Sequence, residues 1–289
     1  MIFTLIVGTK GPKKECLQRF FCSIPMQVKA AKIEIILVDQ NNNQEHQAFY
    51  SEWSERLNLK VFYDSGVGLS RARNIGLQSL NIGHNDNRWL LFPDDDCEYP
   101  SEFFSKLLSK IKETSADGFY FRVMSSENPE IELAYTKRLN KRKLTQNSIF
   151  SSITSINFSH RYLHGAVFDN SLGIGAEFFS SEEMDYVSNL IETGFKFEYA
   201  EDITVQHPDH SLDKFEALAS KVWFNSLGHG AFAAKMFKRG VVYVPFYLLL
   251  IAPISRILLS TVKLELKLSI LGVITLIRRI TGFVRYLIK

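Results

Sequence analysis

Residues 89–96, with the sequence WLLFPDDD, place a short apolar run directly before three consecutive acidic residues. Such a run is typical of a central strand that is buried on both faces of a sheet. Two other apolar runs, residues 2–7 and 33–38, predict further strands of this kind. Helical segments are expected at residues 15–21 and 70–80. This alternation predicts an α/β fold with a mostly parallel central sheet flanked by helices.

Polar residues follow each predicted strand at its carboxyl end. Thr9 and Lys10 follow the first strand, Asp39 the second, and residues 94–96 the third. Ligands of open α/β sheets bind at the carboxyl ends of the strands. The sequence therefore predicts a binding site along this edge of the sheet.

The composition excludes several classes of protein. The chain has 289 residues, of which 46% are hydrophobic and 13% aromatic, which excludes a disordered chain. Cys16, Cys22 and Cys97 form no CxxC pair, which argues against a disulfide scaffold or a cysteine zinc site and favours a reducing compartment. The apolar N-terminus has no preceding basic residue and no small-residue cleavage site, so we expect the catalytic part to start in the cytoplasm.

The acidic triplet is the strongest local feature. Adjacent carboxylates repel one another unless a cation or solvent relieves them, and Mg²⁺ or Mn²⁺ prefers such oxygen ligands. In an extended stretch Asp94 and Asp96 would point to the same side and address one phosphate–metal unit. The alternative is a solvated acidic turn.

A glycine-rich loop leads into the second predicted helix at residues 66–76 (GVGLSRARNIG). Backbone amides at a helix N-terminus attract anions, and Arg71 and Arg73 in the first turns add charge-assisted hydrogen bonds to phosphate. The alternative is an ordinary glycine turn before a basic helix start.

Two later features carry titratable groups. Residues 180–186 (SSEEMDY) open a helix predicted over 181–193, where acidic residues suit the helix dipole and where one carboxylate could act as a general base. His207 follows a strand predicted near residues 197–205. It is either a polar strand end or a metal ligand.

In this order the motifs resemble the family 2 inverting glycosyltransferases of the GT-A fold, in particular the membrane-associated type of bacterial polysaccharide and glycolipid synthesis. Gly68 with residues 72–76 (ARNIG) is similar to the family signature G-x-x-x-A-R-N-x-G, and residues 91–96 resemble the strand that delivers D-x-D. Residues 182–185 (EEMD) and 194–196 (GFK) resemble the acceptor-side pattern. The resemblance covers about residues 1–210.

The resemblance implies transfer of a sugar from a nucleotide sugar, with UDP favoured, to a hydroxyl of a saccharide or lipid-linked acceptor. The implied donor-binding residues are Thr9, Lys10, Asp39, Gly68, Arg71, Arg73, Asp94 and Asp95. The implied ligands of Mn²⁺ or Mg²⁺ are Asp96, Asp94 and His207. Glu183 is the implied catalytic base with Asp185 as the alternative, and Glu182 is expected to bind the acceptor.

The C-terminal part has a different composition. Residues 241–255 carry no charge, but this 15-residue stretch is too short to span a bilayer, and we expect Pro245 and Pro253 to interrupt it. Residues 273–288 have apolar side chains at helical spacing, with Arg278, Arg285 and Lys289 on the opposite face. This pattern predicts a basic amphipathic helix that lies in a membrane interface.

The charge of the chain is divided unevenly. The net charge of +3 combines +9 for residues 235–289 with −6 for residues 1–234. A cationic tail of this kind predicts peripheral, monotopic attachment to the anionic cytoplasmic face of the plasma (inner) membrane. The acceptor would then belong to lipopolysaccharide, capsule or glycolipid assembly. The alternative is that the apolar face packs on the catalytic domain or on a second subunit. In the latter case the protein would be a homo-oligomer.

We expect three regions. Residues 1–97 form the nucleotide-sugar half of a GT-A domain, residues 98–234 the acceptor half, and residues 235–289 the membrane-associating region. Residues 125–159 are expected to be an irregular connection whose basic run at 137–143 contacts acceptor or membrane, and nucleic acid is not an expected partner because this run lacks aromatic residues. The competing functions are a nucleotidyltransferase and a catalytically degenerate membrane-bound scaffold.

Overall fold

A computed structural model describes residues 1–11, 13–25, 28–41, 44–80, 87–133, 136, 143–209 and 215–289. These residues form two compact units. We call residues 1–168 with 186–209 the sheet unit, and residues 169–185 with 210–289 the helical unit. The predicted boundary between residues 234 and 235 falls inside a helix of the helical unit. The roles assigned to the three regions stay predictions.

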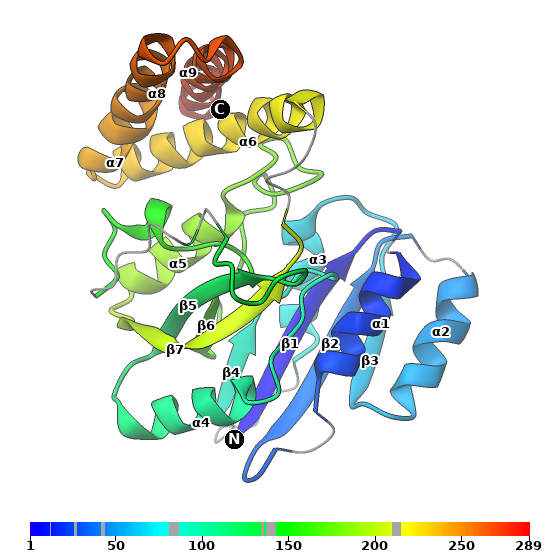
Figure 1. Ribbon diagram of the computed structural model, residues 1–289. Coiled ribbons are helices and arrows are strands. Elements are labelled where there is room, and N and C mark those ends of the chain that lie inside the picture. Colours follow the sequence, from blue (N-terminus) through cyan, green and yellow to red (C-terminus); the bar gives the residue numbers. More distant parts are fainter. Residues whose placement is uncertain are drawn as a thin grey trace. The chain divides into compact units, whose positions relative to one another are not determined.

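The sheet unit contains, within the described residues, a seven-stranded mixed sheet in the order β3-β2-β1-β4-β6-β5-β7 (Figure 1). The strands are β1 (Ile2–Thr9), β2 (Lys32–Asp39), β3 (Leu59–Tyr63), β4 (Arg88–Leu91), β5 (Gly118–Ser125), β6 (Phe158–Arg161) and β7 (Phe197–His207). β6 runs antiparallel to both of its neighbours, and the other pairs are parallel. The predicted α/β fold with a mostly parallel sheet is confirmed.

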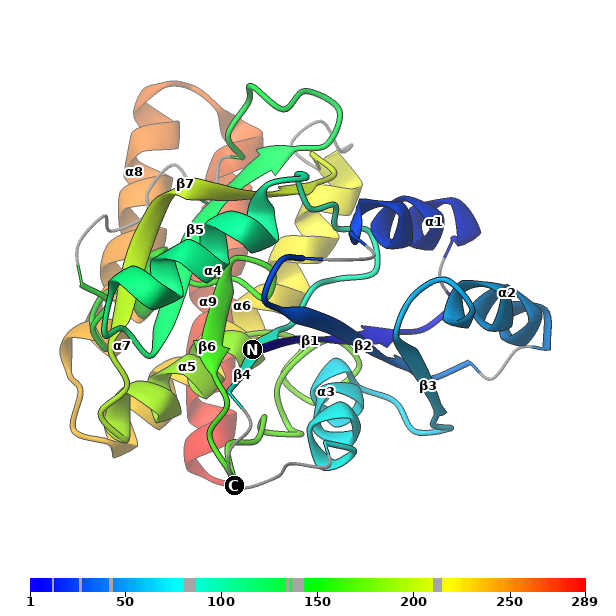
Figure 2. The same cartoon turned by 90° about the horizontal axis from the view of Figure 1, so that it is seen from below.

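Helices cover both faces of the three first strands. They are α1 (Lys14–Ser23), α2 (Gln44–Ser54) and α3 (Leu69–Gln78), and Figure 2 shows α1 and α2 on one face of β1, β2 and β3, with α3 on the other. Alternate residues of β1 serve the two faces. Leu5 belongs to the core cluster that includes Phe20 of α1, whereas Ile6 lies against Gly76 of α3. A Cβ at Gly76 would lie 2.4 Å from Cγ2 of Ile6, so glycine allows α3 this close approach.

Several elements of the sheet unit escape the sequence prediction. They are α2, β3, α4 (Phe103–Glu113), β5 and β6. β6 has only four residues, FSHR, and no apolar run to mark it. Between β5 and β6 the described residues hold one short 3₁₀ helix, η1 (Ile149–Ser151), in agreement with the expected irregular connection. Residues 137–142 of the predicted basic contact lie outside the described residues.

A polar network crosses the sheet through four neighbouring strands. Glu34 of β2 accepts hydrogen bonds from Arg88 of β4, from Thr4 of β1 at 3.3 Å and from Lys60 of β3 at 2.6 Å. The Glu34 side chain is only 10% exposed. Burial opposes its charge, but the hydrogen bonds from Lys60 and Arg88 outweigh burial and lower the pKa of Glu34. The network therefore ties the four strands together at one level of the sheet.

We expect Glu34→Gln to lower the free energy of unfolding by about 3 kcal/mol, because it leaves the buried Arg88 guanidinium without its counter-charge. Urea unfolding at pH 7 measures this loss. The matched control is Glu52→Gln, which removes an exposed carboxylate from an i,i+4 pair with Arg56 and should cost less than about 0.5 kcal/mol. Equal losses in the two variants would contradict a structural role for the network.

The helical unit contains α6 (Phe215–Lys238), α7 (Tyr243–Phe246), the π-helical turn η3 (Tyr247–Ile251), α8 (Ala252–Val262) and α9 (Leu266–Leu287). Glycines let α6 and α9 pack with their backbones almost in contact. A Cβ at Gly230 would lie 2.0 Å from the carbonyl oxygen of Arg279, and a Cβ at Gly282 would lie 2.0 Å from that of Leu227. No larger residue fits at either position without moving a helix.

Part of the predicted amphipathic face of α9 stays exposed. Val273, Ile277, Ile280 and Val284 are each more than 40% exposed. α7, η3 and α8 add further exposed apolar residues, among them Phe246, Leu258, Leu259 and Val262. The helical unit therefore presents a large apolar surface on more than one helix.

The prediction that prolines interrupt residues 241–255 is wrong. The chain stays helical across Pro253 because a π-turn adjusts the hydrogen bonds: the Ala252 N–H donates to the carbonyl of Tyr247. Proline has no N–H to give the Leu248 carbonyl, and Nη1 of Arg279 donates to it at 2.8 Å instead. The helical stretch is also longer than the 15 residues that were expected to be too short to span a bilayer. Among the described residues, the helical stretch Tyr243–Val262 is by length and composition able to cross a membrane, with a mean hydropathy of 1.7.

Candidate active site

The acidic triplet follows β4 in a turn. The Cys97 N–H donates to the carbonyl of Asp94 at 3.3 Å, so the chain reverses immediately after Asp94. Residues 94–96 are therefore not extended, as the sequence prediction assumed. The three carboxylates have different hydrogen-bond or ion-pair partners in the sheet unit, but Asp94 still interacts electrostatically with Asp96 and His207.

Asp94 faces the helix that follows the glycine loop. Its Oδ1 lies 3.3 Å from Nη2 of Arg73, and the Ser155 hydroxyl lies 3.4 Å from both carboxylate oxygens. Arg73 is fully buried, with its guanidinium 5.4 Å from the ring centroid of Phe168. Burial raises the pKa of Asp94, and the charge of Arg73 opposes that rise. The structure thus brings the predicted Arg73 and Asp94 together.

Asp95 faces the end of β1. The Thr9 hydroxyl donates to Oδ2 of Asp95, which joins two residues that were predicted separately for donor binding. Burial raises the pKa of Asp95 to about 6, and the hydrogen bond from Thr9 opposes the rise. A half-buried carboxyl next to a hydroxyl at the strand ends is suited to contact a polar ligand.

Asp96 faces the end of β7. Glu98 and Gln206 exchange backbone hydrogen bonds of 2.9 and 2.8 Å, and this short antiparallel bridge aligns the acidic turn with the strand end. As a result Nε2 of His207 lies 3.2 Å from Oδ1 of Asp96. Burial opposes protonation of His207, but Asp96 outweighs it through its hydrogen bond and charge and raises the pKa of His207.

The pair of Asp96 and His207 has the chemistry of two metal ligands. Nδ1 of His207 lies 2.9 Å from the Pro208 carbonyl, which assigns the Nδ1 proton to that bond and turns Nε2 toward Asp96. A second hydrogen bond of this kind is what fixes a metal-ligating histidine. Carboxylate oxygen and imidazole nitrogen both suit Mn²⁺. Among the described residues no group of three or more His, Cys, Asp or Glu could hold a metal ion.

The remaining residues predicted for donor binding have internal partners or are exposed. Asp39 is fully buried, accepting from the Tyr50 hydroxyl at 2.9 Å and from the Asn41 N–H at 2.7 Å. Lys10 is exposed. Arg71 donates to both oxygens of Asp64, at 2.8 and 2.9 Å. Asp39 and Arg71 therefore hold loops at the edge of the predicted site.

Two residues that the sequence prediction missed support the glycine loop and its helix. The Gln40 side-chain amide donates to the carbonyls of Gly66 and Gly68, at 2.9 and 3.2 Å. Gly68 has a φ of 124°, which other residues rarely adopt. Asn74 pairs with the backbone of Phe168 through both its amide nitrogen and its oxygen. Asn74 stands in the quoted signature and was open to prediction, whereas Gln40 has no sequence signal.

The acceptor-side motif opens α5 (Glu182–Glu192), and its acidic residues belong to the helical unit. Glu182 and Asp185 are buried, whereas Glu183 is partly exposed. Asp185 is held by Lys235 of α6 and by Arg239, which directly follows α6. Of the three acids, Glu183 is thus the one whose side chain reaches solvent.

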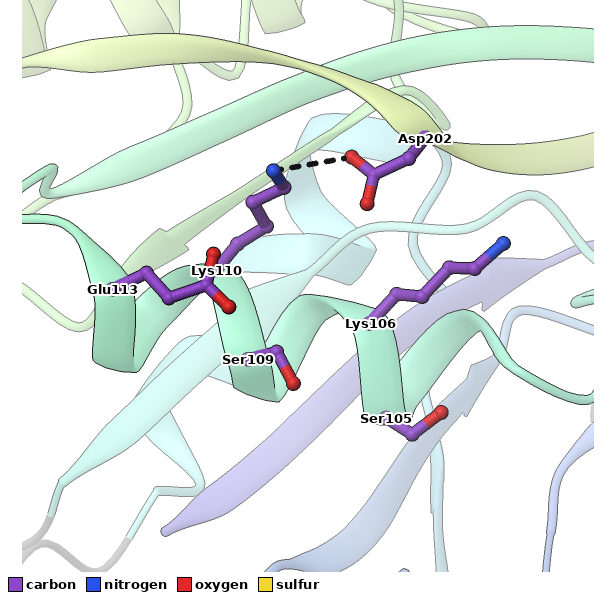
Figure 3. Close-up of a pocket in the computed structure, with 6 residues that line it drawn as sticks. All are labelled: Ser105, Lys106, Ser109, Lys110, Glu113 and Asp202. Atoms are coloured by element: carbon purple, nitrogen blue, oxygen red, sulfur yellow. Dashed lines mark ion pairs between the residues drawn. The ribbon is translucent and has the colours of Figure 1, made fainter.

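Two hollows of the sheet unit contain none of the predicted site residues. One, of about 190 Å³, lies between α4 and β7 and is lined in part by Lys110 and Asp202, which form an ion pair of 3.4 Å (Figure 3). The other, of about 300 Å³, lies beside residues 163–167 and Tyr186. The candidate site is therefore identified from the side-chain contacts at the strand ends and not from either hollow.

The sequence profile of Glycosyl transferase family 2 matches residues 4–172, more than half of the chain. The chain belongs to this family. The resemblance of the motifs predicted this family, and the match confirms it. A search of curated proteins found no match.

Solved structures share the fold at low sequence identity. The mannosyltransferase PcManGT from Pyrobaculum calidifontis, in complex with GDP-Man and Mn²⁺, is 12% identical with a TM-score of 0.64 over 99% of this chain and 86% of that chain. S. aureus TarS 1–349 is 17% identical with a TM-score of 0.53 over 79% of this chain. GalNAc-T7 with UDP, GalNAc and Mn²⁺ is 17% identical with a TM-score of 0.52, over 80% of this chain and 50% of that chain. The match spans 65% of TarS 1–349.

An aromatic cluster surrounds Phe92, the last aromatic residue before the acidic turn. Phe92, two residues before Asp94, packs on Phe158, His160, Phe168 and Tyr186. His160 is fully buried, and its Nε2 lies 3.2 Å from the Tyr186 hydroxyl. Burial lowers the pKa of His160 to about 4. The imidazole is therefore neutral in the folded protein at neutral pH.

His160 should make the protein less stable in mild acid. Below pH 6.5 the unfolded chain takes up a proton on this residue that the folded chain refuses until about pH 4, so stability falls across this window. We expect urea unfolding to show a loss of about 2 to 3 kcal/mol from this group between pH 7 and pH 4.5. His160→Asn should remove this part of the acid loss, whereas the exposed His164→Asn should keep it. An equal acid loss in wild type and His160→Asn would refute the assignment.

Proposed function

We propose that the chain transfers a sugar from a nucleotide sugar, in first place a UDP-sugar, to a hydroxyl of a saccharide or lipid-linked acceptor with inversion at the anomeric carbon. The observation that carries this proposal is the convergence of Thr9, Arg73 and His207 on the three carboxylates after β4. Family membership supports the reaction class. The UDP and GDP-Man in the similar structures support a nucleotide-sugar donor.

In the proposed reaction the acceptor oxygen forms a bond to the anomeric carbon while the bond from that carbon to the diphosphate oxygen breaks. Glu183 takes the proton of the acceptor hydroxyl, and an α-linked donor gives a β-linked product. Its partial exposure at the start of α5 supports this role over the buried Asp185. Thr9 and Asp95 would contact the nucleotide, and Arg73 would approach the diphosphate.

Asp96 and His207 would hold a divalent cation, Mn²⁺ or Mg²⁺, with Asp94 beside them at the diphosphate. When bound, the cation neutralises charge that develops on the departing diphosphate. Two protein ligands leave positions for phosphate oxygens and water, as is usual for these ions in nucleotide sites. The Mn²⁺ of two similar structures supports the choice of metal.

Asp96→Ala and Glu183→Gln should each lower the rate of sugar transfer at least about 100-fold, because the first loses a metal ligand and the second the base. A panel of UDP-, GDP- and dTDP-sugars with Mn²⁺ first identifies the donor that wild type hydrolyses. The matched control is Asp202→Asn, which removes an exposed carboxylate from the hollow in Figure 3 and should keep the rate near that of wild type. Near-wild-type transfer by both Asp96→Ala and Glu183→Gln would exclude these roles.

We also propose that the helical unit attaches the enzyme to the cytoplasmic face of the plasma (inner) membrane, where it would act in lipopolysaccharide, capsule or glycolipid assembly. Residues 235–289 carry a net charge of +9, which suits an anionic leaflet. The exposed apolar residues of α8 and α9 would enter the interface. Exposed apolar residues on α7, α8 and α9 support a membrane or a partner as their cover.

The 289-residue chain with Leu258, Leu259 and Val262 all changed to Ser should bind anionic vesicles at least about tenfold more weakly than wild type, because it loses apolar area that would enter the interface. Co-sedimentation with phosphatidylglycerol-containing vesicles measures this. The matched control changes Ile131 and Val167 to Ser. Both are exposed apolar residues of the sheet unit, so this variant should bind the vesicles as wild type does. Absence of binding by wild type would reject the membrane proposal.

A further inference from the structure

The segment that precedes α5, residues 169–181, packs against the C-terminal helices of the helical unit. Leu172 and Phe178 form a small core with Leu227 and Ala231 of α6. The Ser180 hydroxyl donates to the carbonyl of Asn225 at 2.8 Å. All of these residues belong to the helical unit. The approach to the proposed base is therefore shaped by α6.

Charged contacts continue this attachment. Arg285 and Lys289, at the end of the chain, lie 3.1 and 2.8 Å from the two carboxylate oxygens of Glu177. A Cβ at Gly228 of α6 would lie 2.5 Å from the carbonyls of Phe178 and Ser180, so the segment and the helix are in backbone contact. Both α6 and α9 thus hold the segment that leads to Glu183.

Two residues after Glu183, Asp185 forms ion pairs with two cationic side chains. Asp185 is fully buried, with Oδ2 2.5 Å from Nζ of Lys235 and Oδ1 2.9 Å from Nη2 of Arg239. Lys235 also reaches Oδ2 of Asp169 at 2.8 Å. Burial opposes the charge of Lys235, but Asp185 and Asp169 outweigh it and raise the pKa of this lysine. Both oxygens of Asp185 are engaged by cations, so neither is open to an acceptor hydroxyl.

The backbone at this point needs outside support. Ser181, immediately before α5, has a φ of 75°. A residue other than glycine keeps such a conformation only where its surroundings fix it. The ion pairs of Asp185 supply a fixed point one helical turn further along, because residues 181 and 185 lie on the same side of a helix start. Glu183 stands between these two constraints.

We propose that Lys235 and Arg239 are positioning residues that orient Glu183 through Asp185. The inference rests on the proposed role of Glu183 as the base. Two ion pairs to one buried carboxylate fix both the rotation of the first turn of α5 and its place on α6. The helices with the exposed apolar surface thereby carry the catalytic side chain in the same compact unit, so the C-terminal region serves the chemistry as well as attachment.

Turnover separates this role from a purely structural one. We expect Lys235→Met and Arg239→Met to lower kcat for hydrolysis of the active nucleotide sugar at least tenfold, with the donor KM within twofold of wild type, since the donor residues lie in the sheet unit. The charge-conserving variants Lys235→Arg and Arg239→Lys should have a kcat within threefold of the wild-type value. The matched control, Lys238→Met, removes an exposed lysine one turn from Lys235 and should stay within twofold of wild type.

Thermal unfolding of each variant accompanies the kinetics. If Lys235→Met does not fold, Arg239→Met, which leaves Lys235 with Asp185, provides the same comparison. A wild-type kcat in a folded Lys235→Met or Arg239→Met would overturn the proposal. An equal loss of kcat in Lys235→Arg or Arg239→Lys would also overturn the proposal. Such a loss would depend on the shape of the side chain and not on its charge.

Hydrogen exchange measured by mass spectrometry gives a readout that does not depend on activity. In Lys235→Met the amides of residues 181–187 should exchange at least tenfold faster than in wild type, whereas those of residues 94–99 should be unchanged. Unchanged exchange at residues 181–187 would overturn the positioning role. If wild type hydrolyses none of the nucleotide sugars, the proposed function fails, and the exchange result still decides whether Lys235 and Arg239 hold the start of α5.

Discussion

The burial of β1, β2 and β4 on both faces is the constraint on which the rest of the sheet unit depends. Strands covered by helices on both sides have little room for polar side chains along their length, so such residues gather at the strand ends. Thr9, Asp39 and the acidic turn after β4 lie there for this reason. Thr4, Glu34 and Arg88 are exceptions, and the charge of the buried Glu34 is balanced by Arg88 of β4 and Lys60 of β3.

The candidate site depends on a few contacts between distant parts of the chain. The backbone bridge between Glu98 and Gln206 brings His207 to Asp96, and the pairing of Asn74 with Phe168 seats the helix that carries Arg73. Each contact is made by backbone atoms or by one amide side chain. Small geometric details of this kind decide which carboxylate of the acidic turn meets which partner.

The helical unit combines two properties that a sequence presents separately. Its glycines, Gly230 and Gly282, allow α6 and α9 to pack closely, while apolar residues of α9 such as Val273, Ile277 and Val284 stay exposed. Lys235 of α6 and Arg239, which directly follows this helix, form ion pairs with the buried Asp185. A surface suited to a membrane and a scaffold for the start of α5 thus belong to the same helices.

The sequence by itself determined the α/β class, the central strands, the family and the identity of most candidate site residues, because apolar runs and ordered motifs are local signals. It did not reveal β6, whose four residues carry no pattern, nor the turn that begins at Asp94. It also could not foresee that a π-turn and Arg279 keep the chain helical across Pro253. Only the tertiary structure decided these points, because the partners of Asp94, Asp96, Asp185 and the Leu248 carbonyl come from residues far away along the chain.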